Sequence, residues 1–246
     1  MNLIIKYLCF LILSISILFS KSGKQKTTNI FSSNLSLQIA LKYNIYYPED
    51  YFDVKHNYPL VLFLHGAGER GSNIDLVELH GIPKLIKEGV SFPFVTLAPQ
   101  CPKFQYWSEP VNVKALVLLL EDVLKNYRID PDRVYATGLS MGGYGTLAIA
   151  KERPDLFAGI ISVCGGMDTT NIQKLNNMPI WLFHGEKDEV VPVENSRVIY
   201  ESLKGTNPKI NFTIYPDVKH NAWDITYDNK NIYKWLLEHK RSSKYY

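Results

Sequence analysis

The chain has 246 residues, a length that fits one large α/β domain. Hydrophobic residues make up 46% of it, enough to fill a sizeable core, and the formal net charge is only +3. The basic residues are scattered rather than gathered into a stripe, so the composition argues against a nucleic-acid partner.

Residues 1–22 differ from the rest of the chain. Lys6 precedes an apolar run at 7–19, and small and polar residues follow at 20–23. This pattern is typical of a signal peptide and predicts a secreted or periplasmic protein. As a helix the run would reach only about 20 Å, against about 30 Å of hydrocarbon, so no stable membrane partner is expected beyond this segment. An uncleaved anchor is the alternative, because no A-x-A cleavage site is present.

Two cysteines, Cys101 and Cys164, follow the signal segment. Export would permit a disulfide between them, whereas their apolar surroundings fit small buried thiols equally well. The sequence leaves both arrangements open.

The remainder shows no repeat or long linker, and residues 30–246 are expected to form a single catalytic domain. Alternating apolar residues at 35–47 predict an early antiparallel strand. Short apolar runs then alternate with helical patterns, which predicts an α/β fold: a mostly parallel sheet with helices on both faces. The expected strands are residues 60–64, 94–98, 134–137, 159–163, 180–183 and 210–215, and the expected helices are 113–127, 142–151, 194–203 and 232–239. In such folds, ligands bind beyond the carboxyl ends of the strands.

A nucleophile motif follows the run at 134–137. Residues 138–143 read Gly-Leu-Ser-Met-Gly-Gly, and a helical pattern comes next, which is G-x-S-x-G in its required context of strand, turn and helix. Gly138 and Gly142 permit a turn too tight for side chains, and this turn lifts the Ser140 hydroxyl clear of the sheet. The sequence therefore predicts Ser140 as the nucleophile. The alternative is a glycine-rich turn with an incidental serine.

A serine hydroxyl needs a base to accept its proton, and the chain has six histidines. His220 follows the last apolar run. A triad whose members come in the chain order serine, acid, histidine places its base late in the chain, as His220 is. His65 and His184 each end a strand directly before a glycine, and both are expected to support local turns. His220 is therefore the predicted base.

The acid must lie between the serine and the histidine, at a strand end. Asp188 follows the strand at 180–183 after a short turn, where it would accept the imidazole N–H and stabilise the imidazolium. Asp168, after the preceding strand, is the alternative acid.

Backbone N–H groups are expected to form the oxyanion hole. Met141 directly follows the nucleophile and supplies one donor. The loop after the 60–64 strand reads His-Gly-Ala-Gly-Glu-Arg-Gly at residues 65–71 and supplies the other donor. Ala67 is the first choice in this loop and Gly68 is the second.

Glycines in this loop let the backbone approach a substrate closely, so Gly66 and Gly68 are expected substrate contacts. Arg70 either pairs with an acid such as Glu69 or contacts the substrate, and the sequence does not separate these roles. No cluster of His, Cys and acidic residues has metal-ligand spacing, so no metal is expected.

Five segments, taken in chain order, resemble esterases of the α/β-hydrolase superfamily, in the group related to predicted peptidases, feruloyl esterases and polyhydroxybutyrate depolymerases. They are residues 64–71, 98–102 with Trp107, 138–143, 184–188 and 220–223. The resemblance implies ester hydrolysis without a cofactor and matches Ser140, Asp188 and His220 to the catalytic triad. It also implies that Gln100 and Trp107 lie near the substrate.

Many hydrolases of this fold insert a cap after the strand that here occupies 159–163. Only residues 167–177 separate it from the next strand, which predicts no large cap and a site open to bulky substrates. Trp107, Tyr106 and Trp223 are expected to wall the groove. The favoured substrate is an acyl, feruloyl or acetyl ester, on a polysaccharide or a small molecule. The alternatives are a serine peptidase of the prolyl-oligopeptidase type and a non-catalytic binding module.

Overall fold

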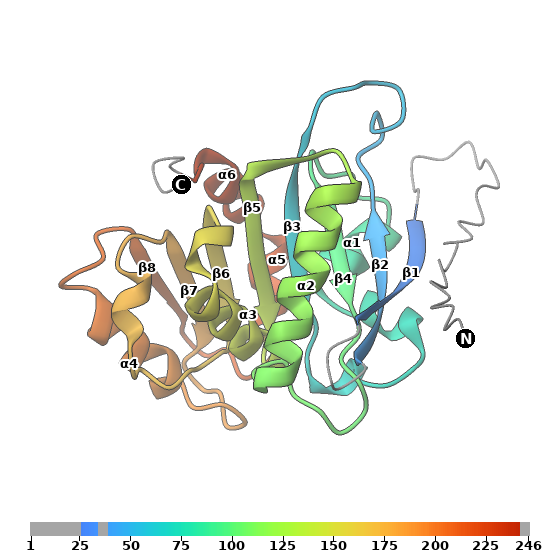
Figure 1. Ribbon diagram of the computed structural model, residues 1–246. Helices are drawn as coiled ribbons and strands as arrows, with labels where there is room; N and C mark the ends of the chain where they lie inside the picture. The colour runs from blue at the N-terminus through green and yellow to red at the C-terminus, as the bar shows by residue number, and fades with distance from the viewer. Residues whose placement is uncertain (1–25, 34–38, 242–246) are drawn as a thin grey trace, which may run out of the picture.

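Residues 26–33 and 39–241 are described by a computed structural model, and the expected signal peptide at residues 1–22 lies outside them. Eight strands form one sheet in the order β1-β2-β4-β3-β5-β6-β7-β8 (Figure 1). Strand β1 pairs antiparallel with β2, and β2 pairs antiparallel with β4, while β4, β3 and β5 to β8 run parallel. The strands are β1 (Lys26–Ser33), β2 (Ile39–Tyr46), β3 (Tyr58–Leu64), β4 (Val95–Pro99), β5 (Ile129–Leu139), β6 (Gly159–Val163), β7 (Ile180–Gly185) and β8 (Ile210–Tyr215). The predicted mostly parallel sheet is confirmed.

Each face of the sheet carries its own hydrophobic core. Every residue of β3 is buried, with Leu60, Leu62 and Leu64 in one core and Val61 and Phe63 in the other, because successive strand residues point to opposite faces. The continuous apolar runs of the sequence reflect this two-sided burial.

Helices cover both faces (Figure 1). On one face lie α2, α3 and α4, whose buried residues belong to the first core. On the other lie α1, α5 and α6, which contribute to the second. Their bounds are α1 (Gly81–Lys87), α2 (Pro110–Asn126), α3 (Met141–Glu152), α4 (Glu194–Leu203), α5 (Ala222–Asp228) and α6 (Lys230–Glu238).

Several elements go beyond the sequence analysis. Strand β1 begins at Lys26, before the expected domain start at residue 30. The expected early strand at 35–47 overlaps β2, and residues 35–38 lie outside the described part of the chain. The short helices α1 and α5 were not predicted, since seven residues give little periodicity. Between β6 and β7 the only helical element is the 3₁₀ turn Ile172–Leu175, so no cap is inserted there.

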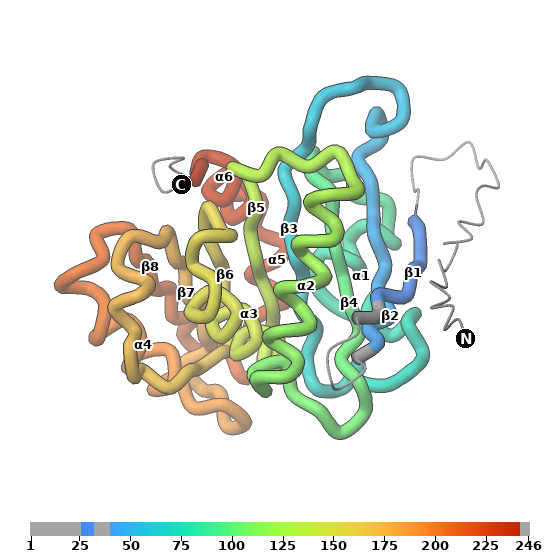
Figure 2. Tube along the Cα trace, viewed as in Figure 1, coloured from blue at the N-terminus to red at the C-terminus, as the bar shows by residue number. Residues whose placement is uncertain are grey.

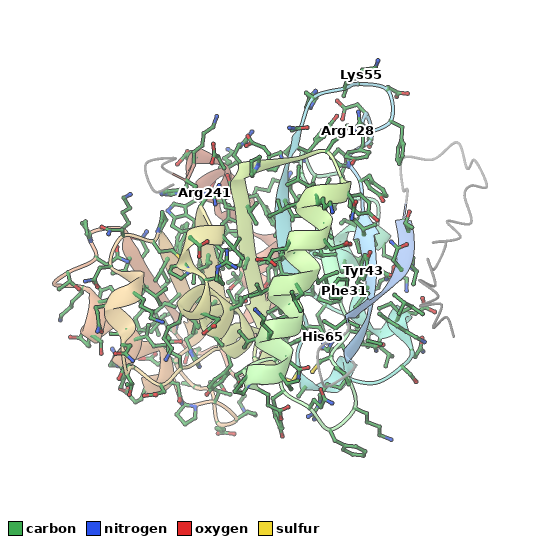
Figure 3. The ribbon with its side chains drawn as sticks, in the orientation of Figure 1. Phe31, Tyr43, Lys55, His65, Arg128 and Arg241 are labelled. Carbon is green, nitrogen blue, oxygen red and sulfur yellow. The ribbon has the colours of Figure 1, made fainter. Side chains whose placement is uncertain are left out.

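The two ends of the sheet differ in what they carry. At one end the Tyr135 hydroxyl donates to the carbonyl of His239 at 2.7 Å, so the end of α6 lies beside the first part of β5 (Figure 2). Figure 3 labels Arg128 near this end and His65 toward the opposite end, where the parallel strands terminate. None of the described helices combines the length and the hydropathy needed to cross a membrane.

Candidate active site

The turn between β5 and α3 holds Ser140 in a strained backbone conformation, with φ 51° and ψ −118°. Glycines make the turn possible: a Cβ on Gly142 would collide with the carbonyl of Leu64, and one on Gly138 would collide with Gly142. The Ser140 N–H donates to the carbonyl of Val163 at 2.8 Å, which anchors the turn to β6. The hydroxyl is therefore presented at the carboxyl end of the sheet.

Three side chains from separate loops meet at this turn. Nε2 of His220 lies 2.9 Å from Oγ of Ser140, and Nδ1 of His220 lies 2.7 Å from Oδ2 of Asp188. Asp188 follows β7, and His220 follows β8. The predicted nucleophile, base and acid are thus brought into one hydrogen-bonded row. Asp168 is instead exposed, and its carboxylate accepts from the N–H and hydroxyl of Thr170.

The carboxylate of Asp188 is buried yet held ionised. Burial acts to raise its pKa, but hydrogen bonds from His220 and from the N–H groups of Val191 and Val190 outweigh it, and the pKa falls below its ordinary value. Oδ1 accepts both backbone bonds, at 2.8 and 2.9 Å. Oδ2 is left to accept from His220, so Nδ1 carries the proton and Nε2 faces the serine as an acceptor.

The loop expected to supply the oxyanion hole starts directly after β3. Ala67 begins the 3₁₀ turn Ala67–Glu69, and Met141 is the first residue of α3. Neither N–H is used in a hydrogen bond among the described residues. Gly66 packs on Leu139, where an added Cβ would lie 2.8 Å from Cδ1. Both candidate donors therefore flank the nucleophile turn, and their assignment to the oxyanion hole stays a prediction.

Buried polar side chains hold the loop at residues 65–71 in place. His65 is 1% exposed; it accepts at Nε2 from the N–H of Cys101 at 2.9 Å and donates from Nδ1 to the carbonyl of Gly66 at 2.6 Å. Burial lowers the pKa of His65 to about 4, so the ring is neutral, as this pair of bonds requires.

Gln100 and Trp107 need correction as expected substrate contacts. The amide of Gln100, 2% exposed, donates to the carbonyls of Glu69 and Asn73 at 2.8 and 2.7 Å. The indole of Trp107, fully buried, donates to the carbonyl of His65 at 3.2 Å. Both side chains point into the protein because they satisfy loop carbonyls, so they hold the loop rather than touch substrate.

Arg70 also holds the loop. Its Nε donates to the carbonyl of Ala67 at 2.8 Å, its Nη1 donates to Gln105 at 3.2 Å, and its guanidinium lies 4.9 Å from the ring centroid of Tyr106. No ion pair joins Arg70 to Glu69 or to another acid of the described residues. The anticipated pairing with Glu69 is therefore absent from the described contacts.

Trp223 lies at the site, with its ring centroid 5.1 Å from that of His220 and nearly perpendicular to it, at 87°. Its half-buried indole supports the base from one side. Gly68 is exposed and Gly66 is buried. Contact of Trp223, Gly66 and Gly68 with substrate stays a prediction.

A cavity of about 610 Å³ lies on the α2 and α3 side of this end. Its lining includes Tyr144, one turn after Ser140, and Met167 and Asp168 from the loop without a cap. Neither Ser140 nor His220 lines it, so it adjoins the row of catalytic candidates without containing it.

His184, which the sequence predicts to support a local turn, lies against the acid. His184 is fully buried, and its Nε2 lies 3.3 Å from Oδ2 of Asp188. Its position at a strand end, four residues before the acid, was the available signal. Cys164, His184 and Asp188 also offer ligand atoms within 4.8 Å of one another. Cys101 and Cys164 are both free and buried.

Known proteins share these features. The Abhydrolase_2 family, described as phospholipase/carboxylesterase, matches residues 110–231. A solved structure described as a thermostable esterase is 35% identical with a TM-score of 0.77, and the match covers 88% of this chain and 63% of that chain.

Two curated proteins are also similar. Poly(3-hydroxyalkanoate) depolymerase C of Paucimonas lemoignei is 32% identical over 117 residues, 45% of this chain and 28% of that protein. The bifunctional acetylxylan esterase/xylanase XynS20E of Neocallimastix patriciarum is 26% identical over 183 residues, 73% of this chain and 26% of that protein. The chain spans less than half the length of the curated relatives it matches. The sheet order and the strained turn at Ser140 show an α/β-hydrolase fold, and the chain is similar to esterases of that superfamily.

Proposed function

We propose that the chain is a serine carboxylesterase that cleaves short or aromatic acyl esters of bulky alcohols, such as acylated polysaccharides. The observation that carries the proposal is the unbroken row of hydrogen bonds from Asp188 through His220 to Ser140. A binding module would have no need of a strained serine, a buried carboxylate and a histidine in this alignment. A secreted or periplasmic location is part of the proposal and rests on residues 1–22 alone.

The geometry supports a two-step reaction. His220 Nε2 accepts the Ser140 proton as Oγ attacks the ester carbonyl, and the resulting oxyanion is stabilised by the N–H groups of Met141 and Ala67. The imidazolium formed is stabilised by Asp188 and then gives its proton to the leaving alcohol. Water, activated by His220 in the same way, attacks the acyl-enzyme carbonyl and releases the acid and free Ser140. No step needs a cofactor.

The loops around the nucleophile leave room for a bulky substrate. The loop between β6 and β7 carries only one 3₁₀ turn, so nothing in it covers the site. Phe104, 80% exposed, and Tyr106, 50% exposed, stand on the loop between β4 and α2, and Arg70 joins that loop to Ala67. Aromatic rings with nearby cationic donors suit a sugar chain, which offers both apolar ring faces and hydroxyls. The acetylxylan esterase among the relatives agrees with this class of substrate.

The ester-versus-amide choice follows from the same openness. An alkoxide leaves with little help, whereas an amine must be protonated while it is held beside His220. Holding a peptide there takes an enclosing element, because a misplacement of about 1 Å can cost about a hundredfold. We therefore expect acetyl or feruloyl esters to have a far larger kcat/KM than matched prolyl amides.

The experiment combines both points. Purified protein is assayed with acetyl, butyryl and feruloyl esters and with a prolyl anilide, and is labelled with a fluorophosphonate probe. Wild type should label and hydrolyse the esters, and Ser140→Ala should do neither. Equal kcat/KM for ester and amide would favour the peptidase, and an unlabelled, inactive wild type would favour a binding module.

A further inference from the structure

We propose that His184 is a positioning residue that holds the carboxylate of Asp188 in its alignment with His220. The proposal rests on the esterase function proposed above. It concerns a buried histidine that the reaction itself does not use.

Hydrogen bonds around His184 settle which nitrogen carries its proton. Nε2 faces two acceptors, the carbonyl of Val191 at 2.8 Å and Oδ2 of Asp188 at 3.3 Å. Nδ1 faces the hydroxyl of Ser196 at 2.7 Å. Burial lowers the pKa of His184, so the ring has a single proton, which must sit on Nε2. With Nδ1 unprotonated, the Ser196 hydroxyl directs its single proton to Nδ1 at 2.7 Å rather than to the carbonyl of Gly165, which lies 3.1 Å away.

This arrangement gives the catalytic carboxylate a complete set of donors. Oδ1 accepts from the N–H groups of Val190 and Val191, and Oδ2 accepts from His220 and is approached by the N–H of His184. His184 also ties the carbonyl of Val191 to β7, so it braces the loop whose amides bind Oδ1. Loss of His184 would remove one N–H from beside Oδ2 and the bond that holds the carbonyl of Val191, and would thereby loosen the alignment of the carboxylate with His220.

Other titratable groups that face this cluster do not replace His184. The Cys164 thiol donates to the carbonyl of His220 at 3.3 Å, and burial raises its pKa to about 12, so it is a neutral donor. Tyr144 lies within electrostatic reach of Asp188, and burial raises its pKa. A metal bound by Cys164, His184 and Asp188 would need the thiol deprotonated and the existing bonds of His184 broken, which argues against a metal site.

The test is a double-mutant cycle on kcat with a small ester. His184→Leu should lower kcat by about 10- to 100-fold, as expected for an acid displaced by up to about 1 Å. His184→Gln, whose amide can place an N–H near the position of Nε2, should keep a larger share of kcat. In the Asp188→Asn background, His184→Leu should change kcat by no more than about twofold, because the two substitutions disrupt the same interaction. The exposed His56→Gln serves as the control.

A second readout separates positioning from general damage. If Asp188 loses its alignment, the imidazolium of His220 loses its partner, so the acidic limb of the pH–rate profile should move to lower pH in His184→Leu. Partly unfolded protein would lower kcat equally at all pH values. If His184→Leu does not fold, Ser196→Ala supplies the cycle, with a smaller loss of kcat in the same direction.

Full additivity of the two losses, with an unmoved pH limb, would overturn the proposal. So would activity that a chelator removes and zinc restores, since that would make His184 a metal ligand. Failure of the esterase proposal is distinct, because the wild type would then hydrolyse no ester and give no cycle to measure.

Discussion

Two buried histidines stand on opposite sides of the nucleophile and perform the same kind of task with opposite tautomers. His65 directly follows β3 and His184 lies near the end of β7, and each directly precedes a glycine. His65 donates from Nδ1 and accepts at Nε2, while His184 donates from Nε2 and accepts at Nδ1. One braces the loop with Ala67, and the other braces the loop with Asp188.

The comparison shows why a neutral histidine suits the end of a strand beside an active site. Each ring joins a donor on one segment to an acceptor on another, which a lysine or a carboxylate cannot do. Burial lowers the pKa of both rings and keeps them in the neutral form that this bridging needs. In the proposed mechanism the two sides differ in outcome: the loop with Ala67 would stabilise a developing negative charge, and the loop with Asp188 holds an existing one.

Removing the centre that the two sides share should have the largest effect. Ser140→Ala and His220→Ala should each lower kcat by at least about 10⁴-fold, and the double variant should lose little more, because the residues act as a unit. Asp188→Asn should lose about 10⁴-fold by favouring the wrong tautomer of His220. Steady-state kinetics with a chromogenic acetate ester measures these losses. Retention of a tenth of wild-type kcat in Ser140→Ala would contradict the mechanism.

Substitution of His65, beside the loop of Ala67, should have the second largest effect on kcat and should distinguish the role of His65 from that of His184. His65→Leu leaves the N–H of Cys101 unpaired and loosens the loop of Ala67, so kcat should fall by about 10²-fold, comparable to losing one oxyanion donor. The acidic limb of the pH–rate profile should stay in place, unlike that of His184→Leu. A limb that moves equally in both variants would mean that the two sides are not separate.

The pH dependence of stability gives a third measure. His65 has a folded pKa of about 4, below an unfolded value of about 6.5. The unfolded chain therefore binds more protons between these values, and the free energy of unfolding falls as pH drops through this window, by about 2 kcal/mol between pH 7 and pH 5. Burial raises the pKa of Glu69, which acts in the opposite direction.

Comparing His65→Gln with wild type by urea unfolding at both pH values isolates the contribution of His65. The variant should be less stable at pH 7 because the packing of the ring is lost, but its free energy of unfolding should fall less on acidification. A wild-type and variant stability difference that is the same at both pH values would rule out a buried neutral His65.

Surface residues beyond both loops should give the smallest effect. Phe104→Ala and Tyr106→Ala should lower kcat/KM for an acetylated xylan by about two- to tenfold each, the scale of one lost aromatic contact. The same variants should match wild type on a small acetate ester, which cannot reach this loop and the nucleophile together. Val198→Ala, exposed on α4, is the matched apolar control. Equal losses on both substrates would remove the aromatic loop from the substrate proposal.

Much of the catalytic row could be predicted from local sequence. Ser140 is recognisable because only glycine fits at Gly138 and Gly142, and the collisions that a Cβ would meet there show why. Asp188 and His220 follow from the chain order of the fold and from their places at strand ends. The parallel sheet follows from apolar runs, because burial on both faces removes polar residues from a strand.

Only the tertiary structure shows which buried side chains hold the active-site loops and the acid in place. The family resemblance places Gln100 and Trp107 near the substrate. Their side chains instead point into the protein and donate to the carbonyls of Glu69 and His65. His184 looked like a turn residue, yet its Nε2 lies against the carboxylate of Asp188. Sequence patterns report how a residue suits its own strand or helix. The partners of a buried polar group come from distant segments, because every such group must find a hydrogen bond wherever the packed fold offers one.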